Sequence, residues 1–423
     1  MRAVVVALGK MGLPLAAQIG LAGHDVVGCD IDPHAVAEIN AGRSPFPGEP
    51  GLDEALSELV AAGRLRAQTD TTAAIAERPD FVLAVPPLLV DSDAKPDWRI
   101  LDSVVADIGR GLKAGTIVSF ETTLPVGTTR QRIAPALQAA SGLRGEQDFF
   151  TVFSPERVYS GRVFKDLATY PKLVGGLSEE GERRGMEAYA SFLDTEVWPM
   201  AGAEGAELAK LAETTYRDLN IAYANELARF ADRAGIDVDR VIDASNSQPF
   251  SHIHRPGIAV GGHCIPVYPR FYLEGDPDAL MPAAGRTANE TMPAYAVQRL
   301  ADLAGGLGGK RVLILGIAYR GGVKETAFSG AFPVRDALVA AGATPVASDP
   351  LYSDDELSAH GFKPWDRGPV DAVIVQADHR DYAELGPADL PGARAILDGR
   401  GVLDAARFVS AGVPVRRIGR PDA

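Results

Sequence analysis

The segment "GIAVGGHCIPVYP" contains Cys264, one of only two cysteines in the chain. Gly261 and Gly262 precede the thiol without side chains that would block its approach, and Pro266 stiffens the chain after it. This pattern predicts a loop that presents the sulfur to a ligand, where a thiolate can act as a nucleophile. Cys29 lies within an apolar run typical of a strand, so we expect a small buried side chain there.

A candidate cation lies in "AELAKLAETTYRD", where Lys210 stands among alanines and leucines. The helical period places Thr214 one turn after Lys210 and Arg217 about one turn further, so the three can share a helix face. Two roles are open for Lys210. Its ammonium group can reach water along an apolar stem, or it can be buried and stabilise a developing oxyanion.

Two other segments place polar side chains directly after short apolar strands. Thr122 and Thr123 occur in "SFETTLPVGTT", and Glu156 and Arg157 occur in "FSPERV". Parallel sheets bind ligands at the carboxyl ends of their strands, so the threonines can face a cofactor or substrate, or bond to backbone in a turn. Glu156 can act as a general base or as a solvated member of an ion pair.

The segment "VVVALGKMGLP" joins a predicted strand to a predicted helix, with Gly9 and Gly12 in the turn. Dinucleotide-binding folds have G-x-G-x-x-G there, which lets the backbone approach a pyrophosphate; Ala7 replaces the first glycine. Asp30 ends the next strand, where a carboxylate accepts the ribose hydroxyls of NAD and repels the extra phosphate of NADP. These features predict NAD binding, and Asp32 is expected to cap the following helix.

Composition excludes several classes of function. The chain has 423 residues, of which 46% are hydrophobic and 23% charged, as in a soluble globular protein. A net charge of -14 argues against a nucleic-acid partner or an anionic membrane surface. The sequence has no recognisable signal peptide or bilayer-spanning run, and its histidines lack metal-ligand spacing. We therefore expect a cytoplasmic protein without a metal.

Strand and helix patterns alternate in two parts of the chain, which is typical of parallel sheets covered by helices on both faces. Between them, residues 204–235 predict a long amphipathic helix that connects domains or forms a dimer seam. A glycine-dense linker follows at 303–310. The predicted strands lie within 2–9, 25–32, 81–87 and 115–123 in the first part, and 311–319, 344–350, 371–378 and 394–400 in the second.

Taken in order, these segments resemble the UDP-glucose/GDP-mannose dehydrogenase family, the nucleotide-sugar 6-dehydrogenases. The likeness covers nearly the whole chain and extends to "RTANETMP", "LGIAYRGGVKE" and "LDGRGVLD". The segments "SPERV", "YRDLNIAYANEL" and "GGHCIPV" look most like the branch that oxidises UDP-N-acetylhexosamines. An ordered set of this kind is far more specific than any single motif.

The resemblance implies a reaction as well as a fold. Family members oxidise a primary alcohol of a UDP-sugar twice, through an aldehyde to a carboxylate, with two NAD. By resemblance, the Cys264 thiolate captures the aldehyde as a thiohemiacetal and later holds a thioester that water hydrolyses. Lys210 matches the lysine that stabilises the oxyanions, and Glu156 the carboxylate that assists water. Thr123 matches the threonine near the nicotinamide, and Thr214 stands at the position of a catalytic asparagine.

The resemblance also implies which residues bind the ligands. Tyr319 and Arg320 match a tyrosine–lysine pair of the C-terminal domain that reaches the nucleotide sugar. The expected cofactor-binding residues are Gly9, Lys10, Met11, Gly12, Asp30, Pro86 and Thr123. The expected substrate-binding residues are Arg157, Val158, Lys210, Arg217, Gly257, Gly261, Tyr319 and Arg320.

The sequence departs from the family pattern at four places. Thr214 replaces the asparagine, and Tyr268 replaces an aspartate after the cysteine loop. Residues 327–329 read Ala-Phe-Ser in place of Arg-Glu-Ser, and residues 258–259 read Ile-Ala in place of Pro-Gly. The nucleophile and the lysine are retained while groups around them change, which leaves three functions to compare. They are four-electron oxidation, two-electron oxidation or internal redox isomerisation on the same scaffold, and nucleotide-sugar binding without catalysis.

The predicted fold is α/β, with two doubly wound Rossmann-like domains joined by a central helical region that contains a long helix. We expect an NAD-binding domain over 1–200, a helical and dimerisation region over 201–304 that carries Lys210 and Cys264, and a UDP-sugar-binding domain over 305–423. The resemblance implies an active site between the outer domains, a homodimer and a role in polysaccharide biosynthesis. The favoured function is NAD-dependent oxidation at C6 of a UDP-sugar, in particular a UDP-N-acetylhexosamine.

Overall fold

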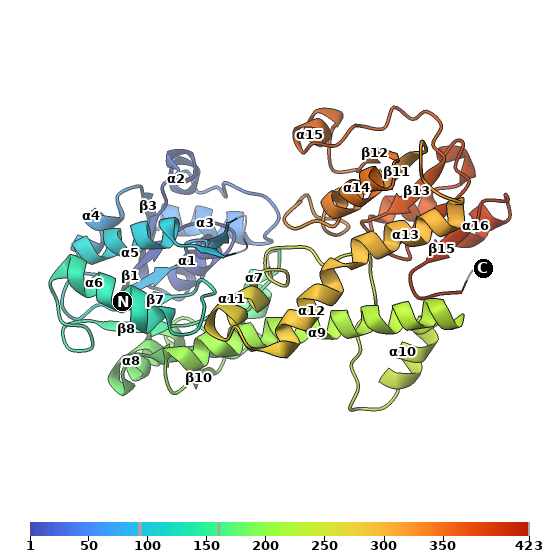
Figure 1. Cartoon of the computed structure of the whole chain (residues 1–423). Helices are drawn as coiled ribbons and strands as arrows, with labels where there is room; N and C mark the ends of the chain where they lie inside the picture. Colours follow the sequence, from blue (N-terminus) through green and yellow to red (C-terminus); the bar gives the residue numbers. More distant parts are fainter. Residues whose placement is uncertain (92–94, 160, 422–423) are drawn as a thin grey trace. The chain divides into compact units, whose positions relative to one another are not determined.

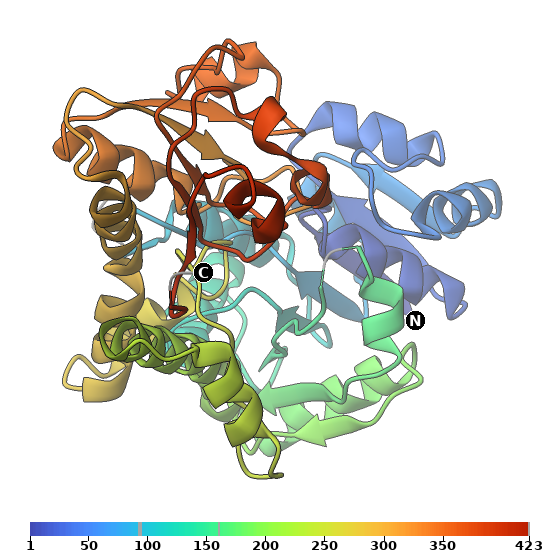
Figure 2. The same cartoon turned by 90° about the vertical axis from the view of Figure 1, so that its right-hand side faces the viewer.

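The computed structural model divides into two compact units. Unit 1 comprises Met1–Glu213 with Glu274–Pro277, and unit 2 comprises Thr214–Leu273 with Asp278–Ala423. Helix α9 (Ala203–Ala234) continues from unit 1 into unit 2, as the long amphipathic pattern predicts (Figure 1). Figure 2 shows this green helix nearly end-on. The structure describes residues 1–91, 95–159 and 161–421.

Unit 1 is built on an eight-stranded sheet in the order β10-β9-β8-β7-β4-β1-β2-β3. The four strands predicted in this part are present. Neighbouring strands are parallel, as the sequence pattern predicts, except β8 and β9, which are antiparallel. In the described residues of the connection from β8 to β9, the helix present is the short α7 (Val163–Leu167), and a long crossover helix is absent. The strands are β1 (Arg2–Val6), β2 (Asp25–Cys29), β3 (Leu65–Gln68), β4 (Phe81–Ala84), β7 (Ile117–Phe120), β8 (Phe150–Phe153), β9 (Lys172–Gly176) and β10 (Val197–Pro199), beside a small hairpin of β5 (Leu89–Val90) and β6 (Pro96–Asp97).

The central strands of this sheet are apolar on both faces. Ala3 and Val5 of β1 belong to a core cluster with α1, α3 and α8, whereas Val4 and Val6 belong to a cluster with α4, α5 and α6. This alternation is the two-residue period of a strand covered by helices on both sides. The helices are α1 (Gly12–Leu21), α2 (Pro33–Asn40), α3 (Leu52–Ala61), α4 (Thr71–Ala76), α5 (Arg99–Gly111), η1 (Thr129–Ile133), α6 (Ala134–Ser141) and α8 (Glu179–Ala190).

Unit 2 contains a second, five-stranded parallel sheet in the order β12-β11-β13-β14-β15. The four strands predicted for this part are present, and β15 adds one that the sequence pattern did not indicate. The strands are β11 (Arg311–Leu315), β12 (Thr344–Ser348), β13 (Ala372–Val375), β14 (Ile396–Asp398) and β15 (Val415–Arg417). The helical segments are α10 (Val238–Asn246), α11 (Tyr268–Gly275), α12 (Leu280–Glu290), α13 (Met292–Ala304), α14 (Ala331–Ala340), α15 (Asp354–Ala359), η2 (Arg380–Glu384), η3 (Pro387–Asp389) and α16 (Ala405–Val409).

The two sheets fix the turn after their first strand in the same way. In unit 1 the Asp30 carboxylate, after β2, accepts a hydrogen bond from the backbone of Leu8 at 2.7 Å. In unit 2 the Asp349 carboxylate, after β12, accepts hydrogen bonds from the backbones of Ile317 at 2.8 Å and Ala318 at 3.0 Å. The predicted fold class, two Rossmann-like domains joined by a helical region, is therefore confirmed.

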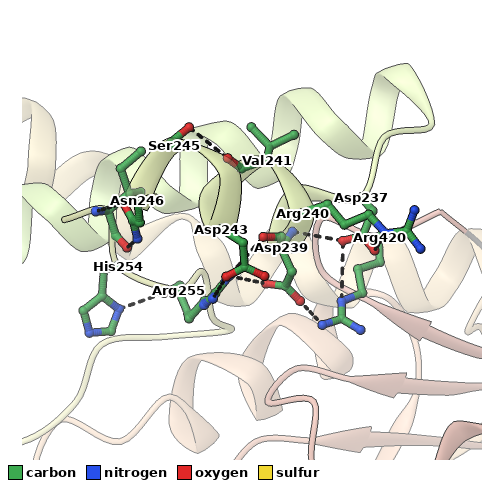
Figure 3. Close-up of polar contacts among 11 residues, drawn as sticks. Asp237, Asp239, Arg240, Val241, Asp243, Ser245, Asn246, His254, Arg255 and Arg420 are labelled. Carbon is green, nitrogen blue, oxygen red and sulfur yellow. Dashed lines mark hydrogen bonds and ion pairs between the residues drawn. The ribbon is translucent and has the colours of Figure 1, made fainter. Parts of the chain in front are cut away.

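The C-terminal segment is fastened to α10 by charged side chains (Figure 3). The Arg420 guanidinium pairs with Asp239 and lies 4.0 Å from Asp237, whose carboxylate also caps α10. Arg255 pairs with Asp239 and Asp243 from the other side. These pairs are partly exposed, so each adds little stability by itself and together they fix the path of the chain. Along the described ranges, no helix combines the length and apolarity needed to cross a bilayer.

Candidate active site

The turn after β1 has the geometry that a dinucleotide-binding fingerprint requires, although its first glycine is an alanine. Ala7 has a φ of 71°, which is left-handed and normally taken by glycine. A Cβ atom on Gly12 would lie 2.0 Å from the Ala7 carbonyl oxygen, so no larger residue fits there. A Cβ atom on Gly9 would have no neighbour within 4 Å, so the backbone at this position is open to a ligand.

The Asp30 carboxylate is held beside this turn by two backbone donors. One oxygen accepts from Leu8 at 2.7 Å and the other from Asp32 at 3.0 Å. Each carboxylate oxygen has two lone pairs, so both can also accept a ribose hydroxyl. Asp32 caps α2 by accepting from the backbone of His34, which confirms its predicted structural role. In the same turn Lys10 is exposed and Met11 is partly buried.

The two threonines after β7 are both buried. The Thr122 hydroxyl donates to the carbonyl of Pro86, which follows the neighbouring strand β4. Thr122 therefore bonds to backbone, the structural alternative for this residue. Thr123 is the next residue along the chain, and its expected roles near the cofactor stay predictions.

Glu156 is part of a buried charged cluster in unit 1, so the solvated ion pair considered from the sequence is wrong. Its carboxylate lies 3.2 Å from the Lys172 ammonium, which lies 2.9 Å from a second buried carboxyl group, Glu121. The hydroxyl of Tyr189 donates to Glu121 at 2.6 Å. Glu156 also accepts backbone hydrogen bonds from Arg157 at 2.6 Å and Val158 at 3.0 Å.

These contacts shift the two carboxyl groups in opposite directions. Burial raises the pKa of Glu121 to about 8, with Lys172 opposing the rise and Glu156 adding to it. Burial also acts to raise the pKa of Glu156, but Lys172, a hydrogen bond with Glu121 and the backbone donor of Arg157 together hold it below its ordinary value. At neutral pH Glu156 is therefore ionised, as a general base must be.

Helix α9 carries three of the predicted site residues. Lys210 is buried, with 9% of its surface exposed, which favours the buried-cation alternative over a lysine extended into water. Thr214 is buried and Arg217 is partly buried on the same helix. Arg157, predicted to bind substrate, donates to Glu213 of α9 at 3.0 Å.

The loop that carries Cys264 is anchored at both ends by a buried polar network within unit 2. Arg286 of α12 pairs with Asp218 of α9 at 2.9 Å and donates to the carbonyl of Pro266, two residues after the cysteine, at 3.1 Å. At the other end, the backbone of Gly257 donates to Asn225 of α9 at 2.9 Å. Asn289 joins the two anchors, because it donates to Asp218 and accepts from Asn225.

Cys264 itself is exposed, whereas Cys29 is buried and its pKa is raised by burial to about 12. The structure thus separates a thiol that a ligand can reach from one that is unreactive. Tyr268, at the position of the family aspartate, begins α11; its backbone donates to the Cys264 carbonyl at 2.9 Å and its ring packs against Phe271.

The glycines of this loop have a packing role that the sequence did not reveal. A Cβ atom on Gly261 would lie 2.6 Å from the Cβ atom of Tyr319, and Gly262 has a φ of 89° with the Tyr319 ring beside it. Gly261 and Gly262 are therefore required for Tyr319 to lie against the loop. The Arg320 side chain folds back and donates to the Tyr319 hydroxyl at 3.0 Å.

Sequence reasoning missed Glu121, Lys172 and Tyr189. The signal that could have identified them is a charged residue at the end of a buried strand, in "IVSFE" and in "KLVGG". Such residues must find a partner of opposite charge or a hydrogen bond. Among the described residues, no group of three or more potential metal ligands is present.

Comparison with known proteins decides which family this geometry belongs to. Models of the UDP-glucose/GDP-mannose dehydrogenase family match residues 1–193 (NAD binding domain), 204–285 (central domain) and 313–405 (UDP binding domain). The chain belongs to this family. It is an NAD-dependent oxidoreductase that acts on nucleotide sugars, and the resemblance found in the sequence is confirmed.

Individual relatives share the full length of this dehydrogenase. A UDP-N-acetyl-D-mannosamine dehydrogenase of Pyrococcus horikoshii is 32% identical and covers 100% of both chains. An NDP-N-acetyl-D-galactosaminuronic acid dehydrogenase of Ralstonia solanacearum is 30% identical and covers 96% of this chain and 97% of its own. The solved structure of the UDP-D-ManNAc dehydrogenase from Pyrococcus horikoshii has a TM-score of 0.89 at 30% identity, with both chains covered completely.

The left-handed backbone of Ala7 makes a stability prediction. Ala7→Gly should raise the free energy of unfolding by up to about 1 kcal/mol, because relief of the left-handed conformation exceeds the entropy that glycine loses on folding. Chemical denaturation measures this change. Gly12→Ala is the opposing control and should destabilise, since its Cβ atom would clash with the Ala7 carbonyl. A less stable Ala7→Gly protein would contradict the prediction.

The cofactor preference follows from Asp30. Asp30→Asn should weaken NAD binding by about tenfold, the effect of losing a charged hydrogen-bond acceptor, and should narrow the preference for NAD over NADP. Dissociation constants for both cofactors measure this change. Asp32→Ala is the matched control, because Asp32 caps α2 and should leave the preference unchanged. Equal affinity of the unaltered protein for NAD and NADP would contradict the assignment.

Proposed function

We propose that the protein oxidises the C6 primary alcohol of a UDP-N-acetylhexosamine to the uronic acid, in two oxidations that use Cys264 as a covalent nucleophile. The observation that carries the proposal is the exposed thiol of Cys264 on a loop anchored at both ends. The names of the full-length relatives, which act on N-acetylated mannosamine and galactosaminuronic acid derivatives, support the acetamido sugar.

NAD, when bound, takes up a hydride in each of the two oxidations. The residues present fit it, because the open backbone at Gly9 and the oriented Asp30 carboxylate can hold a pyrophosphate and a ribose. We assign Gly9, Lys10, Met11, Gly12, Asp30, Pro86 and Thr123 to this role. The family's NAD binding domain, matched over residues 1–193, supports the assignment.

The chemical steps are divided among four side chains. Lys210, a largely buried lysine, stabilises the negative charge that develops on the substrate oxygen. The Cys264 thiolate adds to the aldehyde to give a thiohemiacetal, and the second oxidation leaves a thioester on the sulfur. Glu156 takes a proton from water, which attacks the thioester and releases the uronic acid and the thiol. We assign Thr214, together with Lys210, to stabilising this oxyanion.

The substrate-binding assignments rest on the family. We propose that Arg157, Val158, Lys210, Arg217, Gly257, Gly261, Tyr319 and Arg320 bind the UDP-sugar. The UDP binding domain matched over 313–405 supports the roles of the last two. The division into domains at 1–200, 201–304 and 305–423 is also a proposal, supported by the three matched ranges. Two free cysteines fit a reducing cytoplasm.

We also propose a homodimer formed along α9. Tyr216, Tyr223 and Phe230 follow one another at intervals of seven residues, which places them on one face of the helix. Each is more than half exposed, at 58%, 55% and 60%. A single apolar stripe on a long helix is self-complementary about a two-fold axis, so a second copy of this chain is the partner that fits it.

The covalent mechanism predicts the yield of NADH. The unaltered enzyme should form two NADH for each sugar, with a carboxylate product. Cys264→Ser should stall with the sugar attached, because an ester hydrolyses more slowly than a thioester, and Cys264→Ala should make at most traces of aldehyde. Absorbance and mass spectrometry measure cofactor and products.

Two comparisons make this test specific. Iodoacetamide should modify Cys264 and spare Cys29, and Cys29→Ala should keep the stoichiometry of two. A yield of one NADH with a neutral product would overturn the four-electron proposal. It would favour the two-electron reaction on the same scaffold, with Thr214 and Tyr268 as the differences to investigate.

The homodimer predicts a response to charge on the α9 stripe. Tyr223→Glu should convert the dimer into a monomer, because it would bury two like charges near the two-fold axis. Light scattering during size-exclusion chromatography measures the mass. Val339→Glu, on an equally exposed apolar position of α14, is the matched control and should remain dimeric. A monomeric unaltered protein would contradict the proposal.

A further inference from the structure

Four elements of unit 1 bring a carboxyl pair, Glu121 and Glu156, to one place. Glu121 follows β7 and Glu156 follows the neighbouring parallel strand β8, so both lie at carboxyl ends of the sheet. Strand β9 runs antiparallel to β8, which brings its first residue, Lys172, to the same edge. Tyr189 reaches the pair from α8, and its hydroxyl donates to Glu121 at 2.6 Å.

The charges in this cluster do not balance when both carboxyl groups are ionised. The Lys172 ammonium lies within ion-pair distance of both Glu121 and Glu156, at 2.9 Å and 3.2 Å. The side chains of Lys172, Glu121 and Glu156 are 6%, 0% and 9% exposed, so water does not compensate for an excess negative charge. One bound proton makes the cluster neutral.

The hydrogen bonds show which carboxyl group holds that proton. Glu156 accepts two backbone N–H groups on Oε1 and the Lys172 ammonium on Oε2, which favours its ionised form. Glu121 accepts the Tyr189 hydroxyl on Oε1; its buried Oε2 lies 2.9 Å from the Lys172 ammonium but, in the described part of the chain, receives no hydrogen bond of regular geometry. Glu121 thus has fewer donors than Glu156, so it is the carboxyl group better able to hold the proton, and Glu156, which shares the Lys172 ammonium with it, is the acceptor nearby.

We propose that Glu121 is a positioning residue for Glu156: it carries the proton bound by the carboxyl pair and donates it in a hydrogen bond that keeps Glu156 ionised and oriented. This inference rests on the proposed function, in which Glu156 is the base for the hydrolytic water. Glu121 does not itself contact the substrate, and no proton leaves it during the reaction. It acts only through the geometry and charge of Glu156.

The proposal has a consequence for pH. The groups that face Glu121 are Glu156, Lys172 and Tyr189, and burial raises the pKa of Glu121 to about 8. Above that pH the hydrogen-bond donor is lost and two carboxylates face one ammonium. A carboxyl group with a raised folded-state pKa binds protons more tightly in the folded than in the unfolded protein. Its contribution to stability is therefore complete below its ordinary pKa and declines as the pH rises to about 8.

An infrared titration of the substrate-free protein tests whether Glu121 is the carboxyl group that holds the proton. A protonated carboxyl signal should titrate near pH 8 in the unaltered protein and should be absent in Glu121→Gln. Glu207→Gln is the matched control, because Glu207 is a buried carboxyl group whose pKa is raised to about 7 by burial and which lies in a separate site. This variant should lose a different signal and keep the one near pH 8. If no protonated carboxyl signal disappears in Glu121→Gln, the proposal is overturned. This result does not depend on which reaction the enzyme catalyses.

Turnover tests the positioning role. The turnover of the unaltered enzyme should fall as the pH rises through about 8, because Glu121 then loses its proton. Glu121→Gln keeps a neutral donor to Glu156, so it should retain most of the turnover at pH 7 and should not show this fall. Glu121→Leu has no donor, so the rate of thioester hydrolysis should fall by about tenfold to a hundredfold. The sugar adduct on Cys264 should then accumulate during turnover and be detected after an acid quench. Recovery in Gln but not in Leu distinguishes this role from a purely structural one.

Two results would overturn the positioning role in distinguishable ways. If the infrared signal is present but Glu121→Leu hydrolyses the thioester at the unaltered rate, Glu121 is structural. If the unaltered enzyme forms no carboxylate product, the proposed function fails, and the role of Glu121 in it fails too. In that case the infrared result still identifies the protonated residue.

Discussion

The buried ion pair between Asp218 and Arg286 is the interaction on which the geometry around the nucleophile depends. Breaking such a pair costs about 3–5 kcal/mol, because the remaining charge has no water to solvate it. Here the pair joins α9 to α12 and directs the Arg286 guanidinium to the carbonyl of Pro266. The chain from Ser251 to Gly262 has no helix or strand of its own, so contacts of this kind, rather than backbone ladders, determine where Cys264 lies.

The same physical constraint acts in unit 1 with a different outcome. Asp218 has its own arginine and a donor from Asn289, whereas Glu121 and Glu156 share one lysine. A cluster with one charge too many responds by binding a proton, and its two acids then differ in protonation at neutral pH. In unit 2 the paired charges of Asp218 and Arg286 hold the cysteine loop in place. In unit 1 the two carboxyl groups that share Lys172 form a pair of one protonated and one ionised acid. The difference arises from sheet topology, because only the antiparallel β9 brings Lys172 to that edge.

The sequence predicted the fold to the level of individual strands where the pattern was local. Apolar runs identified β1, β2, β4, β7 and the first four strands of unit 2, and the period of α9 was visible over its whole length. The direction of β9 was not visible, since a five-residue apolar run reads the same in either direction. Glu121, Lys172 and Tyr189 could not be grouped from sequence, because their contact depends on that direction. Cys264 and Asp30 were found because glycines and strand ends mark their surroundings locally.

Departures from the family pattern fall where packing can absorb them. Tyr268 replaces a charged aspartate, yet it begins α11 and its ring packs against Phe271. Its backbone N–H donates to the Cys264 carbonyl, which connects the start of the helix to the cysteine loop. Residues 327–329 lose a charged pair, while the Ala327 carbonyl accepts from the backbone of Gly262 and so still supports the cysteine loop. In both places a backbone contact holds the loop and the side chain is free to change. The groups that cannot change in this way are those whose charge is buried, which include Asp218, Arg286, Glu156 and Lys172.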